Sequence, residues 1–188
     1  MSERTEKAKM LAGEPYRASD DLLMHERMAA RKLFRQYNAT TEEEPELRRQ
    51  ILSRLLGTCH HDTFIEPTFK CDYGYNIHVG EGFYANFDLI ILDVCEVRIG
   101  RNCLLGPRVS LFTATHPLDA EARCSGVESG RAIMIGDNVW IGGQAVINPG
   151  VRLGANVIVA SGAVVTGSFG PNVVIGGVPA KVIRTLEQ

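Results

Sequence analysis

Residues 135–165 read IGDNVWIGGQAVINPGVRLGANVIVASGAVV, and in this stretch an aliphatic residue returns at every sixth position. The recurring residues are Ile135, Ile141, Ile147, Leu153, Val159 and Val165. A second small or apolar residue follows four positions after each of the first five, namely Val139, Ala145, Val151, Val157 and Ala163. The same register occurs upstream at Ile99, Leu105 and Leu111, and a looser version begins near Ile77. A period of six fits neither a helix nor a long alternating strand.

Six residues supply one short strand and one corner, so three such units close a triangular coil of about eighteen residues. Each aliphatic residue then points into the prism and stacks on its counterpart one coil away, about 4.8 Å along the axis. The corners need backbone conformations that Gly, Asn and Asp tolerate, and Gly136-Asp137-Asn138 and Asn148-Pro149-Gly150 provide them. The repeat therefore predicts an all-β main domain, a parallel β-helix of hexapeptide repeats.

The first part of the chain has a different pattern. Residues 1–57 are predicted to form a short helical region, and residues 58–188 to form the β-helix domain. Helices at this end would cover the first coil, because an uncovered repeat exposes its strand edges.

Two helices are expected in this region. Over Asp20–Tyr37 apolar residues recur near helical spacing, and Ser19 or Asp20 is the expected N-cap. A second helix is expected to begin near Thr41, because Thr41 and Glu44 have the spacing of a capping box.

The composition is that of an ordinary globular protein, with 45% hydrophobic residues and a formal net charge of -2. No cluster of Lys and Arg occurs, so a nucleic acid is not expected as a partner, because such binding depends on neutralising phosphates. No apolar run reaches the length of a membrane span, and the charged residues of Met1–Leu11 do not predict a signal peptide. The five cysteines are odd in number and lack CxxC spacing, which indicates free thiols in a reducing cytoplasm.

The repeat is interrupted at residues 112–134, which are predicted to protrude from the coil as a loop. The positions there that continue the period of six would not fill an apolar prism, since they are Pro117, Arg123 and Ser129. Long excursions from a regular scaffold are often where function lies. At the base of this loop Pro117 holds His116 in an extended conformation, which makes His116 the best candidate for a catalytic histidine.

Several motifs carry a resemblance to a known family that covers nearly the whole chain. They are Asp72-Tyr73-Gly74-Tyr75-Asn76-Ile77, Tyr84-Ala85-Asn86-Phe87-Asp88, Thr113-Ala114-Thr115-His116-Pro117, Asn138-Val139-Trp140-Ile141-Gly142 and Gly176-Gly177-Val178-Pro179-Ala180. With these motifs the chain resembles the maltose and galactoside O-acetyltransferases and the related nodulation acetyltransferases, and the maltose enzymes most of all. The resemblance implies a left-handed β-helix, a homotrimer with sites between neighbouring subunits, and acetyl-CoA as donor. The implied acceptor is a hydroxyl of a sugar such as maltose or glucose, with galactosides and oligosaccharides as alternatives.

The resemblance also implies roles for individual residues. His116 would be the general base, with Asn86 near the reacting atoms. Asp72, Tyr84 and Asp93 would bind the acceptor, although Val94 is an alternative counterpart of Asp93. The implied contacts to the donor are Asn86, Gly143, Ser161, Thr166, Gly167, Lys181 and Arg184. Many relatives have Lys at the position of Gly167, so this chain lacks one side chain that would bind the donor.

Direct transfer is the expected mechanism, because a sugar hydroxyl is protonated at neutral pH and needs a base such as imidazole to attack a thioester. A cysteine nucleophile is the competing route, but Cys103 occupies an inward position of the repeat and is expected to be buried. A zinc-dependent β-helix enzyme would need three imidazoles, and the coil contains only His78 and His116, so no metal is expected. A non-catalytic β-helix that acts as a structural or binding subunit is the remaining alternative.

Overall fold

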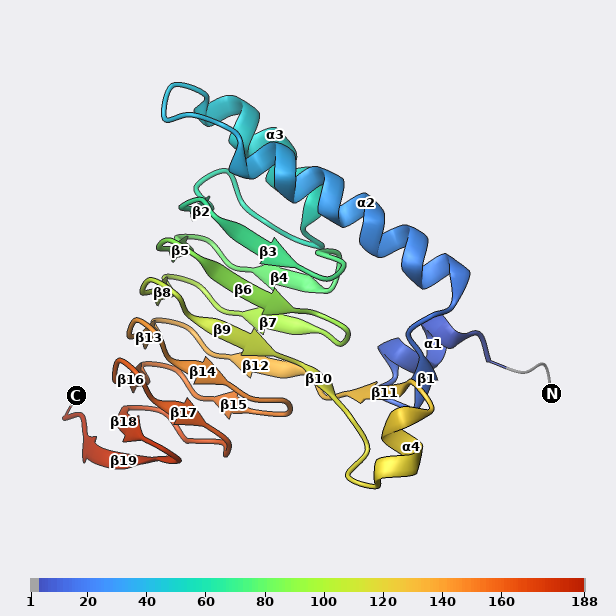
Figure 1. Ribbon diagram of the computed structural model, residues 1–188. Coiled ribbons are helices and arrows are strands. Elements are labelled where there is room, and N and C mark those ends of the chain that lie inside the picture. Colours follow the sequence, from blue (N-terminus) through green and yellow to red (C-terminus); the bar gives the residue numbers. More distant parts are fainter. Residues whose placement is uncertain (1–3, 188) are drawn as a thin grey trace.

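The computed structural model describes residues 4–187, which form a parallel β-helix with helices at one end and a small helical and sheet region at one side (Figure 1). Residues 1–3 of the predicted helical region and residue 188 of the predicted β-helix domain lie outside the described residues. The chain winds from the coil that contains β2 to the coil that contains β18, and the prism has three flat faces.

Each face is a parallel sheet in which neighbouring strands come from successive coils. The first face contains β2 (Phe64–Ile65), β5 (Tyr84–Ala85), β8 (Leu104–Leu105), β13 (Trp140–Ile141), β16 (Ile158–Val159) and β18 (Val173–Gly177), with β19 (Ala180–Thr185) added antiparallel at its edge. The second face contains β3 (Phe69–Cys71), β6 (Leu89–Leu92), β9 (Ser110–Phe112), β14 (Val146–Ile147) and β17 (Val164–Val165). The third face contains β4 (Ile77–Val79), β7 (Val97–Ile99), β12 (Ile133–Ile135) and β15 (Arg152–Leu153).

The strand register confirms the predicted coil. Ile135 pairs with Leu153 and Ile141 pairs with Val159, so each residue lies opposite the residue eighteen positions later. In the earlier coils the step is twenty, as between Ala85 and Leu105, which explains the looser sequence pattern there.

The predicted inward positions form the core of the prism. The six aliphatic residues of the repeat are between 0% and 4% exposed. The residues that follow four positions after the first five of them are at most 1% exposed. Corners are tight: a Cβ atom on Gly142 would lie 2.5 Å from the backbone nitrogen of Ser161 in the next coil, so only glycine fits there. Asn138 and Asn156 take positive φ angles of 58° and 57° at equivalent corners.

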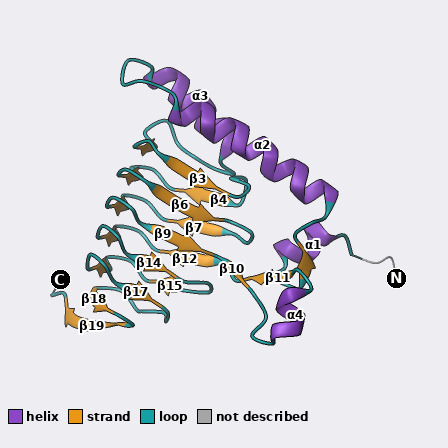
Figure 2. Ribbon diagram, in the orientation of Figure 1, coloured by secondary structure: helices purple, strands orange, loops and turns teal. Residues whose placement is uncertain are grey.

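Two long helices cover the open end of the first coil (Figure 2). They are α2 (Asp21–Asn38) and α3 (Pro45–Leu55), and the buried hydroxyl of Tyr37 donates to the carbonyl of Ile65. The second helix begins four residues later than predicted. The Glu44 carboxylate accepts from the N–H and the hydroxyl of Thr41 and closes a turn before the helix, so it does not cap an N–H of α3. None of the helices in residues 4–187 is long and apolar enough to cross a membrane.

The N-cap of α2 gives a first testable prediction. The Asp20 Oδ1 atom accepts from the Leu23 N–H at 3.2 Å. Asp20→Ala removes this bond, so we expect the free energy of unfolding to fall by about 1 kcal/mol in urea melts. Ser19→Ala is the matched control, because Ser19 is exposed and makes no side-chain hydrogen bond within the described chain. Equal midpoints for the two variants would contradict the assigned cap.

The remaining elements lie beside the prism. They are α1 (Glu6–Leu11), β1 (Tyr16–Arg17), β10 (Ala114–Thr115), α4 (Ala120–Cys124) and β11 (Val127–Gly130). Three of them form an antiparallel sheet in the order β1-β11-β10, which joins the N-terminal segment to the segment that interrupts the repeat (Figure 1).

Candidate active site

His116 is exposed and follows β10, at the corner where the chain passes from the second face to the third. We call this edge of the prism the His116 corner. Its base is fixed by Thr113, which is fully buried. The Thr113 hydroxyl donates to the Leu92 carbonyl at 2.7 Å and accepts from the Cys95 N–H at 3.0 Å. The loop therefore leaves the prism from a rigid point, and His116 lies three residues beyond it.

The N-terminal segment holds the loop from the other side. Strand β1 pairs with β11, and β11 pairs with β10, so residues far apart in sequence form one sheet. The Cys95 thiol also donates to the Met10 carbonyl at 3.2 Å. The hexapeptide pattern could not predict this pairing, because it joins residues about 110 positions apart without any repeat.

A pocket of about 240 Å³ brings His116 together with Asp72, one of the predicted acceptor-binding residues. Its wall includes the apolar residues Leu92, Val94 and Ala114 and the tyrosines Tyr16 and Tyr73, and its charged or imidazole side chains are Arg27, Arg31, Asp72, His116 and Glu128. His116 and Glu128 also line a second pocket of about 420 Å³, whose wall includes Pro15 and Pro149. Sequence reasoning missed Arg27, Arg31 and Glu128, because their place depends on how the N-terminal segment packs against the loop.

In this pocket, which we call the His116 pocket, Arg27 is held in place by two hydrogen bonds. One Arg27 nitrogen donates to the Tyr73 hydroxyl at 2.6 Å, and another donates to the Ala18 carbonyl at 2.6 Å. Burial raises the pKa of Asp72, and the nearby guanidinium of Arg27 opposes that rise. The pocket therefore offers carboxylate acceptors and guanidinium donors around His116, which suits a ligand with several hydroxyl groups.

Asp93 lies behind this pocket and not in it, contrary to the expectation that it holds acceptor hydroxyls. Its side chain is fully buried, and its Oδ1 atom accepts from the backbone N–H groups of Asp72 and Tyr73 at 3.0 Å and 2.9 Å. The Oδ2 atom is buried without a hydrogen-bond partner in the described residues. Asp93 thus shapes the turn that carries Asp72, and the neighbouring Val94 lines the pocket instead.

The buried position of Asp93 predicts a pH-dependent stability. Burial raises its pKa from 3.8 to about 7, so between these values the folded chain holds a proton that the unfolded chain has lost. The contribution of Asp93 to the free energy of unfolding is complete below pH 3.8 and is lost as the pH rises through about 7. In urea melts at several pH values, the free energy of unfolding of Asp93→Asn should not fall over this pH range as that of the native protein does. The reason is that Asn keeps the Oδ1 acceptor but does not ionise. Parallel pH profiles for the two proteins would refute the assignment.

Other predicted residues lie on a different edge, between the first face and the second, which we call the Asn86 corner. Asn86 follows β5, Gly143 follows β13 and Ser161 follows β16. The Gly162 N–H donates to the Gly143 carbonyl at 2.9 Å, so Gly143 and Ser161 lie on adjacent coils. Close to this corner, on the first face, the Tyr84 ring stacks on Phe64 with centroids 5.9 Å apart.

The two corners are separated by the second face. Its strand β6, four residues long, lies between Asn86 and Asp93 and spans about 13 Å at about 3.3 Å per residue. Thr166 and Gly167 follow β17 and therefore lie on the His116 corner, and Lys181 and Arg184 lie exposed on β19. Within one chain, His116 is not brought together with Asn86, Tyr84, Gly143 or Ser161.

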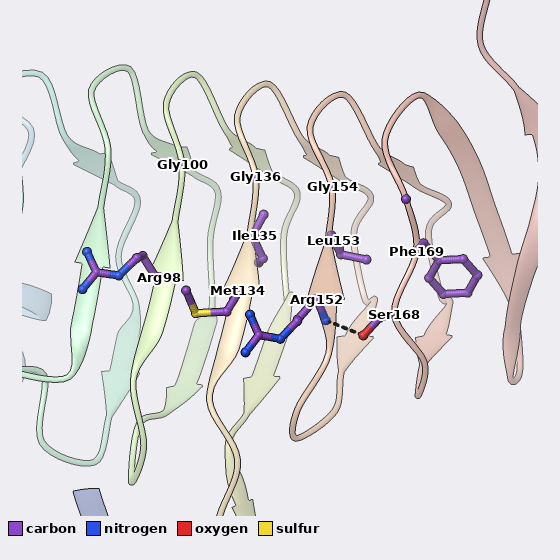
Figure 3. A pocket seen from close by; sticks show the side chains of 11 residues that line it. Arg98, Gly100, Met134, Ile135, Gly136, Arg152, Leu153, Gly154, Ser168 and Phe169 are labelled. Atoms are coloured by element: carbon purple, nitrogen blue, oxygen red, sulfur yellow. Dashed lines mark hydrogen bonds between the residues drawn. The ribbon is translucent and has the colours of Figure 1, made fainter. Parts of the chain in front are cut away.

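A larger groove of about 650 Å³ runs along the third face (Figure 3). Arg98, Met134 and Arg152 lie on successive coils there, and the Arg152 N–H donates to the Ser168 hydroxyl at 3.0 Å. None of the predicted site residues lines this groove. In residues 4–187 no three His, Cys, Asp or Glu side chains are grouped so that they could hold a metal ion.

The hexapeptide coil places the chain in the class of hexapeptide-repeat transferases. The family description "Maltose acetyltransferase hexapeptide capping motif" matches residues 9–60, and "Bacterial transferase hexapeptide (six repeats)" matches residues 132–167. The crystal structure of a maltose O-acetyltransferase from Clostridium difficile 630 is similar over 100% of both chains, with 49% identity and a TM-score of 0.98. The chain belongs to the family of the maltose and galactoside O-acetyltransferases.

Two further relatives show the breadth of this family. A structure of galactoside acetyltransferase in complex with coenzyme A is 37% identical, with a TM-score of 0.95, and the match covers 98% of this chain and 92% of that one. Nodulation protein L of Rhizobium meliloti is 43% identical over 95% of this chain and 98% of its own length. The resemblance seen in the sequence is confirmed by these matches.

Proposed function

We propose that the protein transfers the acetyl group of acetyl-CoA to a hydroxyl of a sugar such as maltose or glucose, with His116 as general base. The observation that supports this most is the His116 pocket, where an exposed imidazole lies beside a half-buried carboxylate and the fixed guanidinium group of Arg27. Hydroxyl groups of a sugar both donate and accept hydrogen bonds, so they can pair with carboxylates and guanidinium groups together. Acetyl-CoA as donor is supported by the family and by the coenzyme A in the structure of the galactoside relative.

We further propose that the working form is a homotrimer and that each site lies between two subunits. The predicted residues fall on two corners separated by a face of the prism, with His116, Thr166 and Gly167 on one and Asn86, Gly143 and Ser161 on the other. A homotrimer with cyclic symmetry repeats one heterologous contact, which can bring the His116 corner of one subunit against the Asn86 corner of the next. A long donor molecule between them would then touch residues from both corners.

The proposed location is the cytoplasm. All five cysteines are free, and three of them, Cys71, Cys95 and Cys103, are buried. Free thiols persist where the surroundings are reducing.

Thiol release from acetyl-CoA tests the proposed function. The assay uses maltose, glucose, a thiogalactoside and chitin oligomers in parallel, and mass spectrometry identifies any acetylated sugar. Acetylation of maltose or glucose is the expected result. Acetylation of only the thiogalactoside or only the oligomers would replace the proposed acceptor. Thiol release that never exceeds the acceptor-free rate would favour a non-catalytic binding subunit.

A further inference from the structure

Glu128 lies in the middle of the small antiparallel sheet, between the N-terminal segment and His116. In the register Tyr16 lies opposite Glu128, and Thr115 lies opposite Ser129. His116 is the first residue after β10, and continuing the same register by one position would place it opposite Glu128. Residues directly opposite each other in an antiparallel pair share a face, with Cβ atoms about 5 Å apart. Tyr16, Glu128 and His116 therefore form a row, which agrees with His116 and Glu128 lining the same two pockets.

One oxygen of the Glu128 carboxylate is fixed by Tyr16. The Tyr16 hydroxyl donates to Glu128 Oε2 at 2.9 Å, and the Tyr16 side chain is only 1% exposed. It packs in a cluster with Met10, Leu23 and Val94, so its hydroxyl has little freedom to move. The carboxylate is thus held by a buried donor from another part of the chain.

The other oxygen of Glu128 is available to a ligand. Within residues 4–187 Glu128 makes no other side-chain hydrogen bond, and it forms no ion pair with His116. Glu128 is half-buried in the wall of the His116 pocket. The carboxylate bonds Tyr16 and not the imidazole, and because Glu128 and His116 line the same pockets, a hydroxyl group bound there can approach both side chains.

We propose that Glu128 is a specificity-determining residue, which accepts a hydrogen bond from a second hydroxyl of the acceptor beside the one that His116 deprotonates. This inference rests on the proposed function and assigns part of its acceptor site. An ionised carboxylate can only accept, so it favours a ligand group that donates. A sugar with a hydroxyl next to the reacting one satisfies Glu128, whereas an analogue without that hydroxyl leaves the carboxylate unpaired. Tyr16 acts as a positioning residue, because it holds the carboxylate in the pocket.

Steady-state kinetics of Glu128→Gln test the proposal. The amide keeps the shape of the side chain but loses the negative charge, so we expect the KM for the acceptor to rise about 10- to 100-fold, as for the loss of a hydrogen bond to a charged group. The kcat should stay within a few-fold of the native value. Tyr16→Phe should raise the KM for the acceptor by a smaller factor, because the carboxylate is then free to leave the pocket. Glu121→Gln is the matched control, since Glu121 is exposed on α4 and lines neither pocket.

Deoxy sugars give a second measurement that does not depend on how well the variant folds. With the native protein, one monodeoxy glucose should show a KM about 10- to 100-fold above that of glucose. In Glu128→Gln this penalty should disappear for that analogue alone. Equal increases in KM in both proteins for every analogue would overturn the proposal. An unchanged KM of Glu128→Gln for glucose would also overturn it.

The outcomes separate this proposal from the proposed function. If the native protein acetylates no sugar, both fall together. If the native protein is active but Glu128→Gln lowers kcat for every acceptor with little change in KM, the residue orients the imidazole and does not bind the acceptor. That result would overturn the specificity role while leaving the proposed function intact.

Discussion

Replacement of His116 by alanine is expected to lower the kcat of acetyl transfer by about 10²- to 10⁴-fold. A sugar hydroxyl is a poor nucleophile until its proton is removed, and in the His116 pocket the imidazole is the side chain suited to accept that proton. Because the His116 side chain is exposed, its removal should leave the folded structure intact. Thiol release at saturating acetyl-CoA and acceptor measures the loss directly.

The matched control for this variant is His25→Ala. His25 is also an exposed histidine, but it lies on α2 and lines neither pocket beside the loop. It should keep native turnover, and both variants should melt at the native temperature. Near-native turnover of His116→Ala would show that the base is assigned to the wrong residue.

The proposed reaction is a direct transfer between two bound molecules. The acceptor oxygen forms a bond to the acetyl carbonyl carbon while its proton passes to a nitrogen of His116. The carbonyl oxygen becomes an oxyanion, which needs hydrogen-bond donors around it. When the oxyanion collapses, the carbon–sulfur bond breaks and the thiolate of CoA takes the proton back from the imidazolium. Charge and protons balance without another reactant.

A covalent route through a cysteine fits the structure poorly. Cys71, Cys95 and Cys103 are buried, and burial raises the pKa of each thiol, that of Cys103 to about 11. A nucleophilic cysteine needs the opposite shift, because the thiolate is the reactive form. The buried position of Cys103 was predicted from the repeat, because Cys103 lies four positions after Ile99 and residues at that spacing point inward.

The sequence was sufficient to predict the coil but not the surroundings of the loop. Each inward position is repeated, so an error at one residue is corrected by the others, and Ile141 or Val159 could be placed without any structure. The His116 loop has no such redundancy. Its partners Tyr16 and Arg27 come from the N-terminal segment, and long-range pairing of that kind leaves no period in a single sequence.

Asp93 shows the same limit at a single residue. A carboxylate at a corner is expected to face solvent, since Asp is common in turns. Here the corner turns inward, and the carboxylate binds two backbone N–H groups of the preceding coil. Which of two adjacent residues, Asp93 or Val94, faces the pocket depends on this turn and not on residue type.

Asn86 is the best placed of the predicted residues to complete the site from the other corner. Its Oδ1 atom accepts from the Phe87 N–H at 2.8 Å, which fixes the orientation of the amide group. The amide nitrogen makes no hydrogen bond within the described residues and can donate to an oxyanion. Loss of one oxyanion donor costs about 10²- to 10³-fold in kcat, so Asn86→Ala should be nearly inactive by itself.

Mixed trimers of His116→Ala and Asn86→Ala should recover activity that neither variant has alone. If each site takes His116 from one subunit and Asn86 from the next, every trimer that contains both variants has one fully native site, which is about a third of its sites. Co-expression of the two chains with different affinity tags, followed by purification through both tags, yields the mixed trimers, and thiol release measures the recovery.

A mixture of His116→Ala with His116→Gln is the control, because no site in it contains a native histidine. Mixed trimers that show only the residual activities of the two variants would place both residues in the same subunit's site, and a monomer in light scattering would remove the shared site altogether. Recovery to about a third of the native rate would be difficult to explain otherwise, since the two corners of one chain are separated by the whole width of the second face.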